Sequence, residues 1–238
     1  MKPLSNELMK SSPKKVAVFD IDGTIFRSSL MIELLEEFIE QGVFPASARR
    51  IFEEEHRMWL ERRGSYNDYT KKIIEAYFKH IKGVKLDDAL EVANLVMLFH
   101  KNRVYRYTRD LVEKLRDTHF LLAISHSPYH IVEPFCREWG FQKVYAFFYE
   151  VNDKGYFTGS IEDEALMRDK GKIFQRAIEK EHLTLKGSVG VGDSESDITF
   201  LKMVQKPIAF NPSSGLYKVA KRNKWDIIVE RKDVMYRL

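Results

Sequence analysis

The sequence of 238 residues predicts an α/β fold, in which helices cover a parallel sheet and an all-helical segment is inserted after the first strand. Three observations predict it. A buried-strand pattern at residues 14–20 ends in an acidic residue, helical patterns fill residues 28–105, and strands alternate with helices from residue 107 onward. Because ligands of such sheets bind beyond the carboxyl ends of the strands, polar residues there are candidates for a functional site.

The first strand, Lys14–Asp20, has two lysines, then four apolar residues, and a carboxylate at its end. Residues 22–24 (Asp-Gly-Thr) then predict a turn. Leucines and a phenylalanine at helical spacing indicate a helix over residues 30–38. Apolar residues at similar spacing predict three further helices between residues 51 and 97, separated by glycine and proline residues.

After residue 107, short apolar runs alternate with helical patterns. We predict strands at Phe120–Ser125, Val144–Tyr149, Ser188–Val191, Ile208–Phe210 and Ile227–Val229. We predict helices at residues 109–117, Tyr129–Trp139, 169–182, 195–204 and 214–223. Residues 151–161 predict a hairpin with a Lys-Gly turn. The alternation indicates a parallel sheet wrapped by helices.

The length also bears on domain organisation, because about 150 residues per domain gives about 1.6 domains. The helical segment accounts for the excess. We expect a core domain formed by residues 14–27 and 106–238, a helical cap domain at residues 28–105, and a flexible N-terminal arm at residues 1–13. A core of about 160 residues is an ordinary size for one domain.

Composition and charge exclude several classes of protein. Hydrophobic residues make up 44% of the chain and aromatic residues 13%, which excludes a disordered chain. The net charge of +4 is too mild for a dedicated nucleic-acid binder, so no nucleic-acid partner is expected. Cys136 is the single cysteine, which fits a reducing compartment. With no signal-peptide pattern and no transmembrane segment, we expect a cytoplasmic protein.

Two pairs of acidic residues follow predicted strands. Asp20 and Asp22 come after the first strand, and Asp193 and Asp197 come after Ser188–Val191. Four carboxylates at one sheet edge would repel one another unless a cation offset their charge, and carboxylate oxygens suit Mg²⁺. Each pair taken alone also fits a solvated turn or a helix cap.

Two further residues at strand and helix ends suggest an anion site. Ser125 ends a strand and is followed by His126 and a helix, where a hydroxyl and free N–H groups would favour an anion. Lys170 lies where another helix begins, although the helix dipole disfavours a cation there. A neighbouring anion or carboxylate cluster would resolve that conflict. Lys172 is a competing candidate for the same role.

Together these residues resemble the four motifs of the haloacid dehalogenase superfamily. The matching positions are Asp20-x-Asp22-Gly23-Thr24, Ser125, Lys170 and Gly192-Asp193-x-x-x-Asp197. The order and the helical insert after the first motif are similar to subfamily IB, the phosphoserine-phosphatase-like branch. The resemblance implies a Rossmann-like sheet with a helical cap. It also implies a Mg²⁺-dependent phosphatase of a small phosphorylated metabolite.

The resemblance implies a role for each acidic residue. Asp20 would be the nucleophile that forms an aspartyl-phosphate, and Asp22 would act as general acid and base. Mg²⁺ would be held by Asp20, by the main-chain carbonyl of Asp22 and by Asp193. Asp197 would bind the metal or orient Lys170.

The resemblance also implies a phosphate-binding set. Ser125 and Lys170 would bind the transferring phosphoryl group, helped by N–H groups near Gly23 and His126. Ser196, beside the last acidic residue, is counted with this set. His126 would contact the phosphate or the leaving group, or else pack in the turn.

The chain departs from the phosphoserine-phosphatase pattern at several positions. Ser29 replaces a Glu that helps bind the amino acid, and our register places Ile73 where a substrate-binding Arg is expected. Ser196 replaces an Asn, and His126 replaces a Gly. These differences argue against phosphoserine itself as the substrate.

Other readings remain open at the level of sequence. Basic doublets in the insert, at residues 49–50, 62–63 and 71–72, form a solvated helix face or attract an anionic substrate. A phosphatase of lipid headgroup phosphates at a membrane surface, a phosphotransferase or phosphomutase, and a binding protein that has lost catalysis are the alternatives. The sequence makes no prediction of the oligomeric state.

Overall fold

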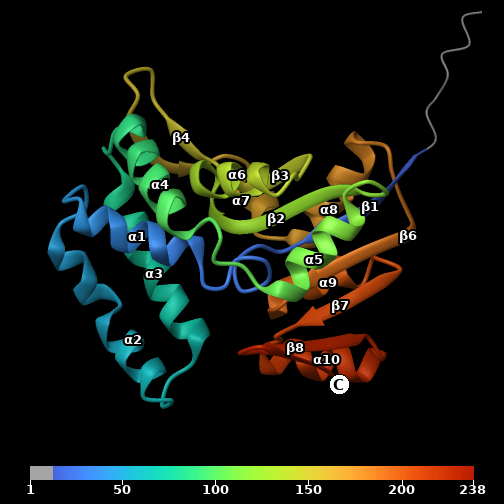
Figure 1. Cartoon of the computed structure of the whole chain (residues 1–238). Helices are drawn as coiled ribbons and strands as arrows, with labels where there is room; N and C mark the ends of the chain where they lie inside the picture. Colours follow the sequence, from blue (N-terminus) through green and yellow to red (C-terminus); the bar gives the residue numbers. More distant parts are fainter. Residues whose placement is uncertain (1–12) are drawn as a thin grey trace, which may run out of the picture.

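A seven-stranded sheet in the order β3-β2-β1-β6-β7-β8-β9 forms the centre of the computed structural model, which describes residues 13–238 (Figure 1). Its strands are β1 (Lys14–Phe19), β2 (Phe120–Pro128), β3 (Lys143–Phe147), β6 (Leu183–Gly192), β7 (Lys206–Phe210), β8 (Asp226–Arg231) and β9 (Val234–Arg237). All neighbouring pairs are parallel except β8 and β9. The predicted α/β fold is confirmed.

The register of the central strands brings their carboxyl ends to one edge. Phe19, the last residue of β1, pairs with Ala123 of β2 and with Val191 of β6. The residues that follow these positions therefore lie side by side, although they are about a hundred or more positions apart in sequence. Val16 to Phe19 of β1 are fully buried on both faces of the sheet, so the strand lies in the core.

The helices after the insert cover the sheet. They are α5 (Arg106–Leu115), α6 (Tyr129–Glu138), α7 (Glu164–Met167), α8 (Lys170–Lys180), α9 (Ile198–Leu201) and α10 (Ser214–Asn223), with a short 3-10 helix η2 (Glu195–Asp197). The helix α6 packs on β2 and β3, α8 and α9 pack on β6, and α10 packs on β7 and β8. The predicted helix at residues 195–204 is shorter than expected, since η2 and α9 end at Leu201.

A group of helices between β1 and β2 lies beside the sheet, at the left of Figure 1. They are α1 (Leu30–Glu40), η1 (Ala46–Ile51), α2 (Glu53–Leu60), α3 (Tyr66–Ile81) and α4 (Leu86–His100). We call residues 28–105 the helical insert. Its core includes Phe38 and Phe44, whose stacked rings lie 4.6 Å apart, with Tyr77 packed edge-on to both.

The helical insert packs on the rest of the chain through α1 and α4, which contact α6, and backbone hydrogen bonds join it at both ends. At its base, Arg27 N–H donates to the carbonyl of Arg103, and Tyr105 N–H donates to the carbonyl of Ile25. At its far end, a hairpin of β4 (Tyr149–Val151) and β5 (Phe157–Ile161) pairs with the turn between α3 and α4. The hairpin is the one predicted over residues 151–161, and it begins slightly earlier.

Two features lie outside the sequence prediction. The edge strand β9 was not predicted, because all its residues are exposed and show no buried alternation. The predicted N-terminal arm lies outside the described residues, apart from Pro13. Among the helices of the described region, none combines the length and apolar character needed to cross a membrane.

Candidate active site

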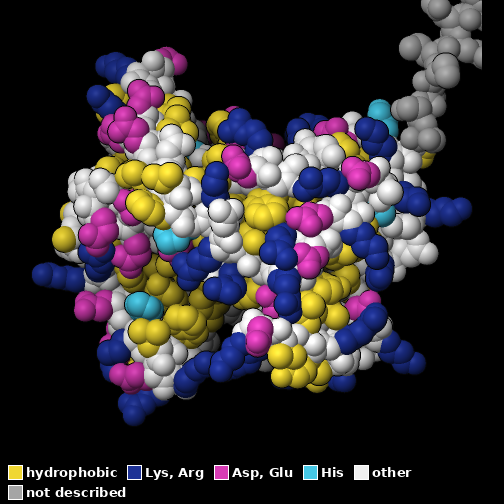
Figure 2. All heavy atoms as spheres, in the orientation of Figure 1, with side chains coloured by type: hydrophobic (Ala, Val, Ile, Leu, Met, Phe, Trp, Pro, Cys, Tyr) yellow, Lys and Arg dark blue, Asp and Glu magenta, His cyan; other side chains and the backbone are white. Residues whose placement is uncertain are grey.

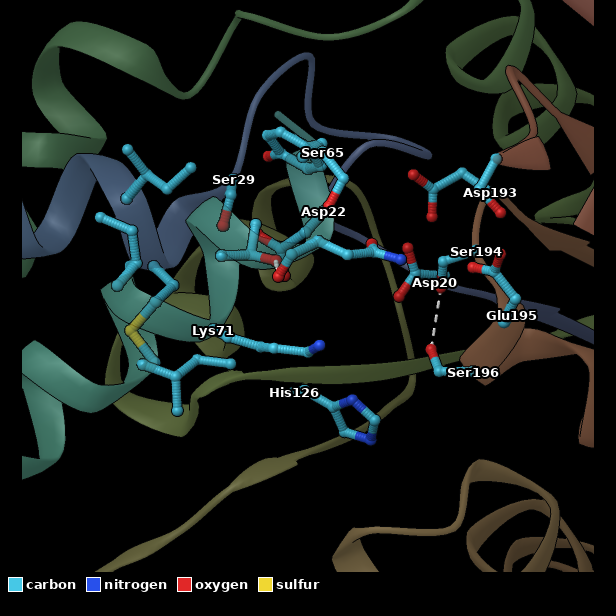
Figure 3. Close-up of a pocket in the computed structure, with 18 of the residues that line it drawn as sticks. Asp20, Asp22, Ser29, Ser65, Lys71, His126, Asp193, Ser194, Glu195 and Ser196 are labelled. Atoms are coloured by element: carbon cyan, nitrogen blue, oxygen red, sulfur yellow. Dashed lines mark hydrogen bonds between the residues drawn. The ribbon is translucent and has the colours of Figure 1, made fainter. Parts of the chain in front are cut away.

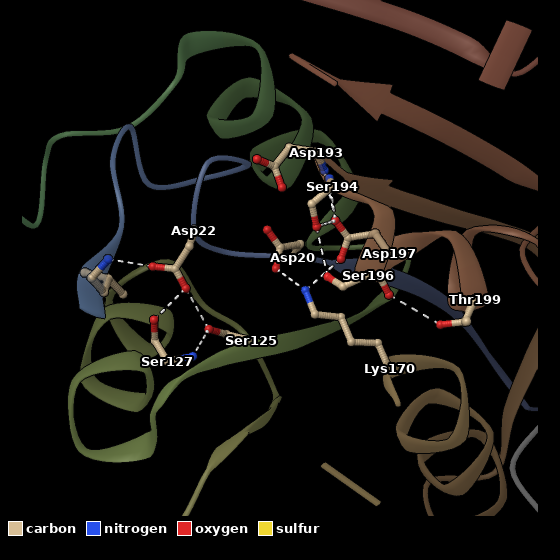
Figure 4. Close-up of polar contacts among 11 residues, drawn as sticks. Asp20, Asp22, Ser125, Ser127, Lys170, Asp193, Ser194, Ser196, Asp197 and Thr199 are labelled. Carbon is tan, nitrogen blue, oxygen red and sulfur yellow. Dashed lines mark hydrogen bonds and ion pairs between the residues drawn. The ribbon is translucent and has the colours of Figure 1, made fainter. Parts of the chain in front are cut away.

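Asp20 follows β1 directly, and its backbone N–H donates to the carbonyl of Val191 on β6 at 3.0 Å. Strand pairing therefore holds its backbone at the sheet edge. The residue is 3% exposed. Its Oδ1 accepts a hydrogen bond from Lys170 Nζ at 2.5 Å, whereas its Oδ2 is buried and has no hydrogen-bond partner (Figure 4). One oxygen of this carboxylate is thus held and the other is unsatisfied.

Lys170 is the first residue of α8, a helix whose N-terminus is capped by the Asp169 side chain. Its buried ammonium also donates to Asp197 Oδ1 at 2.7 Å. Burial alone would lower the pKa of Lys170, but the charges of Asp197 and Asp20 outweigh it and raise that pKa. The two carboxylates explain how a cation is stable at a helix N-terminus.

Asp197 is fully buried and fully hydrogen-bonded. Its Oδ2 accepts from the backbone N–H of Asp193 at 3.0 Å, and from the backbone N–H and the hydroxyl of Ser194 at 2.9 and 3.1 Å. With Oδ1 taken by Lys170, this carboxylate has its main hydrogen-bonding positions filled. The geometry therefore suits Asp197 to orient Lys170 and the loop after β6.

Asp22 points toward β2 instead of toward the other acidic residues. Its Oδ2 accepts hydrogen bonds from the hydroxyls of Ser125 and Ser127, both at 2.8 Å, and its Oδ1 accepts from the N–H of Leu30 at 2.5 Å. Ser29, the residue before α1, makes no side-chain cap, so Asp22 satisfies an N–H at the start of the insert's first helix.

Asp20, Asp193 and Asp197 offer carboxylate oxygens that lie within 4.8 Å of one another. Burial raises the pKa of Asp20 to about 7, with Lys170 opposing the shift and Asp197 and Asp22 adding to it. Burial, with the charges of Asp20 and Asp197, also raises the pKa of Asp193 well above its usual range. A single ammonium does not neutralise this cluster, and the unsatisfied Asp20 Oδ2 faces it, so the donor set fits a divalent cation.

Two glycines make the cluster possible. Gly23 has a φ of +79°, and a Cβ there would lie 2.2 Å from Asp193 Oδ2. A Cβ at Gly192 would lie 2.5 Å from the Cβ of Asp197. Any larger residue would therefore push Asp193 or Asp197 out of place.

Three residues of the predicted phosphate-binding set have other partners. The Gly23 N–H donates to the carbonyls of Phe26 and Ser28, so in this structure it is engaged within its own turn. The exposed Ser196 shares a hydrogen bond of 2.9 Å with the hydroxyl of Ser194. His126 stacks on Phe147 with ring centroids 5.2 Å apart.

His126 lines the site as an uncharged ring. Its Nε2 is buried and has no hydrogen-bond partner. Burial, together with the nearby charge of Lys170, lowers the pKa of His126 to about 4. The ring is therefore neutral at pH 7, and it contributes shape and a polar atom to the site.

These residues face a cavity of about 890 Å³ between the sheet edge and the helical insert. In Figure 2 the surface is hollowed between the helices of the insert and the C-terminal strands, and hydrophobic side chains line the insert's side of the hollow. Figure 3 shows Asp20, Asp193 and His126 on the core side, with Ser65 and Lys71 reaching in from the insert.

Several residues of this cavity were not predicted from the sequence. One is Ser127, which is buried and donates a hydrogen bond to Asp22 as Ser125 does. Its position two residues after Ser125 could have indicated this, since residues two apart on a strand share a face. The basic doublets divide: Arg62 and Lys71 line the cavity, whereas their neighbours Arg63 and Lys72 pair with glutamates on the outer surface.

The chain is similar in sequence to several known proteins and similar in fold to solved structures. The "Inhibition of morphological differentiation protein" of Streptomyces azureus is 24% identical over 221 residues, covering 92% of this chain and 79% of that protein. A histidinol-phosphatase of Neisseria meningitidis serogroup C (strain 8013) is 23% identical over 227 residues, covering 90% and 98%. The structure of a substrate-bound phosphoserine phosphatase superposes with a TM-score of 0.60 and 21% identity, covering 94% of this chain and 96% of that one. Its likeness confirms the expected fold.

A family model supplies the broader assignment. The model described as haloacid dehalogenase-like hydrolase matches residues 17–202, which is most of the chain and includes every acidic residue of the cluster. The sequence-based prediction of a hydrolase is confirmed. The chain therefore belongs to the haloacid dehalogenase-like hydrolase family.

Proposed function

We propose that the protein is a Mg²⁺-dependent phosphatase that hydrolyses a small phosphomonoester through an aspartyl-phosphate on Asp20. The observation that carries the proposal is the state of the Asp20 carboxylate. Lys170 holds one oxygen at 2.5 Å, while the other oxygen is buried, unbonded and close to Asp193. Asp20 lines the cavity, and its unbonded Oδ2 is available to attack an electrophile there.

The carboxylates of Asp20 and Asp193, with the main-chain carbonyl of Asp22, would hold the Mg²⁺ ion. When bound, the ion supplies positive charge that offsets the carboxylates and the phosphoryl oxygens. Asp197 would remain a positioning residue, because its oxygens are already taken by Lys170 and by the loop after β6. Lys170 would contribute a second positive charge to the phosphoryl group.

In the first step, Asp20 Oδ2 would attack the phosphorus, and the bond from phosphorus to the alcohol oxygen would break. Asp22 would donate a proton to that oxygen, so that a neutral alcohol leaves. In the second step, Asp22 would accept a proton from water as the water oxygen attacks the phosphorus. The bond to Asp20 then breaks, and inorganic phosphate is released with the Asp20 carboxylate restored.

The hydroxyls of Ser125 and Ser127 would bind Asp22 at one stage of the reaction and phosphoryl oxygens at another. Their hydroxyls now donate to one oxygen of Asp22, at 2.8 Å each. When Asp22 carries a proton, it offers less negative charge to these donors, and a phosphoryl oxygen becomes the better acceptor. His126 would stay neutral and line the site beside them.

The helical insert would act as a cap domain over a core of residues 14–27 and 106–238. Its helices α1 and α3 form one wall of the cavity, and the core forms the other. A closed wall excludes bulk water during transfer and surrounds the leaving group. The residues of the insert would therefore be the main determinants of substrate specificity.

The test is a phosphate-release screen over phosphorylated metabolites, phosphoserine included, with Mg²⁺ and with EDTA. We expect release that requires Mg²⁺ and falls at least about 10⁴-fold in Asp20→Asn, as for loss of a nucleophile. Asp117→Asn, which changes an exposed aspartate outside the cavity, is the matched control and should keep full activity. Activity in a folded Asp20→Asn protein, or equal activity in EDTA, would overturn the proposal.

A further inference from the structure

The insert wall of the cavity carries residues that the proposed chemistry does not use. Met31 and Ile32 come from α1, and Ile73 and Ile74 come from α3. Met31 and Ile73 are almost fully buried, whereas Ile32 and Ile74 keep part of their surface exposed. These four side chains form an aliphatic patch within a wall that also carries Ser29, Ser65, Asn67 and Thr70, and the patch suits an apolar group of the substrate.

An aromatic ring continues this wall toward the cavity mouth. Tyr66 is the first residue of α3, and its ring packs against Trp59 with centroids 5.3 Å apart. Tyr66 is 38% exposed and lines the cavity. Burial against the site, with the charges of Asp22 and Asp193 adding to it, raises the pKa of the Tyr66 phenol, so the ring stays neutral.

The charged residues of the same wall are cations. Arg62 and Lys71 line the cavity, and Figure 3 shows the Lys71 side chain extending into it toward His126. Lys71 Nζ lies 3.5 Å from Asp68 Oδ1, but both side chains are well exposed, so that pair is weak. Among the described residues, no aspartate or glutamate of the insert lines the cavity.

Four acidic residues line the core wall. Asp20 and Asp193 would hold the metal ion, Asp22 accepts hydrogen bonds from two serines and from Leu30, and Glu195 accepts the N–H of Gly215 at 3.1 Å. Within the part of the chain that the structure describes, the insert wall itself offers an ammonium group no carboxylate beside its aliphatic residues. A carboxylate or second phosphate in that position would instead meet Arg62 and Lys71.

We propose that the alcohol part of the substrate is a hydrocarbon or aromatic group that carries an anionic substituent and no ammonium. The inference rests on the proposed phosphatase function, and it adds the substrate class. The hydrocarbon would lie against Ile32 and Ile74, and the anion would lie near Lys71. Phosphoserine, which carries an ammonium group and little hydrocarbon, is outside this class.

The test uses three esters with the same chain: hexyl phosphate, 6-phosphooxyhexanoate and 6-aminohexyl phosphate. We expect kcat/KM to be highest for the carboxylate and at least about tenfold lower for the ammonium ester. Methyl phosphate should be about tenfold poorer than hexyl phosphate, because it cannot reach the apolar wall. Ile74→Asn should remove most of that chain-length preference.

Charge reversal on α3 provides the matched pair of variants. Lys71→Glu should invert the order of the carboxylate and ammonium esters. Lys72→Glu, one position along, should leave the order unchanged, since Lys72 pairs with Glu75 and does not line the cavity. Equal kcat/KM for all three esters, or a wild-type preference for the ammonium ester, would overturn the inference.

A binding measurement tests the substrate class independently of the proposed phosphatase activity. The same esters are titrated by calorimetry into Asp20→Asn protein, which cannot turn them over. The expected order of affinity without any turnover in wild type would refute the phosphatase and leave the cavity assignment standing. Turnover that depends on Asp20 but favours the ammonium ester would refute only the substrate class.

Discussion

The hydroxyl of Ser127 donates a hydrogen bond to Asp22 Oδ2 at 2.8 Å. The same oxygen accepts from Ser125, and the other oxygen of Asp22 accepts from the N–H of Leu30 at the start of α1. The carboxylate is therefore tied both to the end of β2 and to the first helix of the insert. A residue proposed to move protons is held in place by the segment that forms the cavity's outer wall.

Replacing Ser127 with alanine should slow turnover without unfolding the protein. The change removes one hydrogen bond to a charged group, which contributes about 1.5–3 kcal/mol. We expect kcat to fall about tenfold or more, because the proposed function of Asp22 lies in the chemical steps. KM should rise as well, because Ser127 is also proposed to bind a phosphoryl oxygen. The measurement is steady-state phosphate release with Mg²⁺. Ser160→Ala on the hairpin is the control, and an unchanged kcat in Ser127→Ala would argue against this role.

Replacing Lys170 with methionine should weaken the fold as well as the activity. The change leaves the buried carboxylates of Asp20 and Asp197 without their cation, and loss of one partner of a buried pair costs about 3–5 kcal/mol. Urea unfolding in EDTA measures the free energy of unfolding. Lys172→Met, on the exposed side of the same helix, should change it by less than about 0.5 kcal/mol. Equal stability of the two variants would contradict the buried-pair account.

Mg²⁺ should stabilise the wild-type protein against unfolding. At about 100 times its dissociation constant, an ion that binds only the folded state adds about 2.7 kcal/mol. Asp193→Asn should lose most of this gain. In EDTA the same variant should be more stable than wild type, since it removes a half-buried carboxylate whose pKa is raised by desolvation and by the charges of Asp20 and Asp197. Thermal unfolding with and without Mg²⁺ checks both effects, and a full Mg²⁺ response in Asp193→Asn would count against the metal site.

His130 should make the fold sensitive to acid. Burial lowers the pKa of this histidine from 6.5 to about 4, so the folded protein favours the neutral ring. The unfolded chain binds the proton first as the pH falls, so this contribution is complete above pH 6.5 and is lost between pH 6.5 and 4. The loss amounts to about 2–3 kcal/mol.

The contribution of His130 is isolated by comparison with a variant. Asp20 and Asp193 titrate in the opposite direction over part of this range, because burial raises their pKa values. The difference in unfolding free energy between wild type and His130→Gln cancels their contribution. That difference should shift against wild type by about 2–3 kcal/mol from pH 7 to pH 4. A difference that does not vary with pH would contradict a His130 ring that is kept neutral in the folded protein.

Much of the sheet and its acidic edge could be predicted from local pattern. The run from Val16 to Phe19 is apolar and ends in Asp20, and both features are visible in a few residues. The edge strand β9 has no such pattern, since its residues are exposed on both faces. It exists because β8 offers a free edge for pairing, which is a tertiary property.

The site residues could be predicted where a motif coincides with the end of a strand. The direction of each side chain could not be predicted, because it depends on tertiary packing. Asp22 and Asp193 have similar sequence settings, but only the structure turns Asp22 toward Ser125 and brings Asp193 to Asp20. Likewise Lys71 and Lys72 are identical in sequence character. The packing of α3 directs one into the cavity and leaves the other paired with Glu75 on the surface.

The most direct test of the central claim is to trap the covalent intermediate. The enzyme is mixed with Mg²⁺ and a hydrolysed ester, quenched in acid and reduced with borohydride, which converts an aspartyl-phosphate to homoserine. Mass spectrometry should then find homoserine at position 20, and none in protein quenched without substrate. An active enzyme that yields no modification at position 20, or that carries phosphate on Ser125 instead, would contradict Asp20 as the nucleophile.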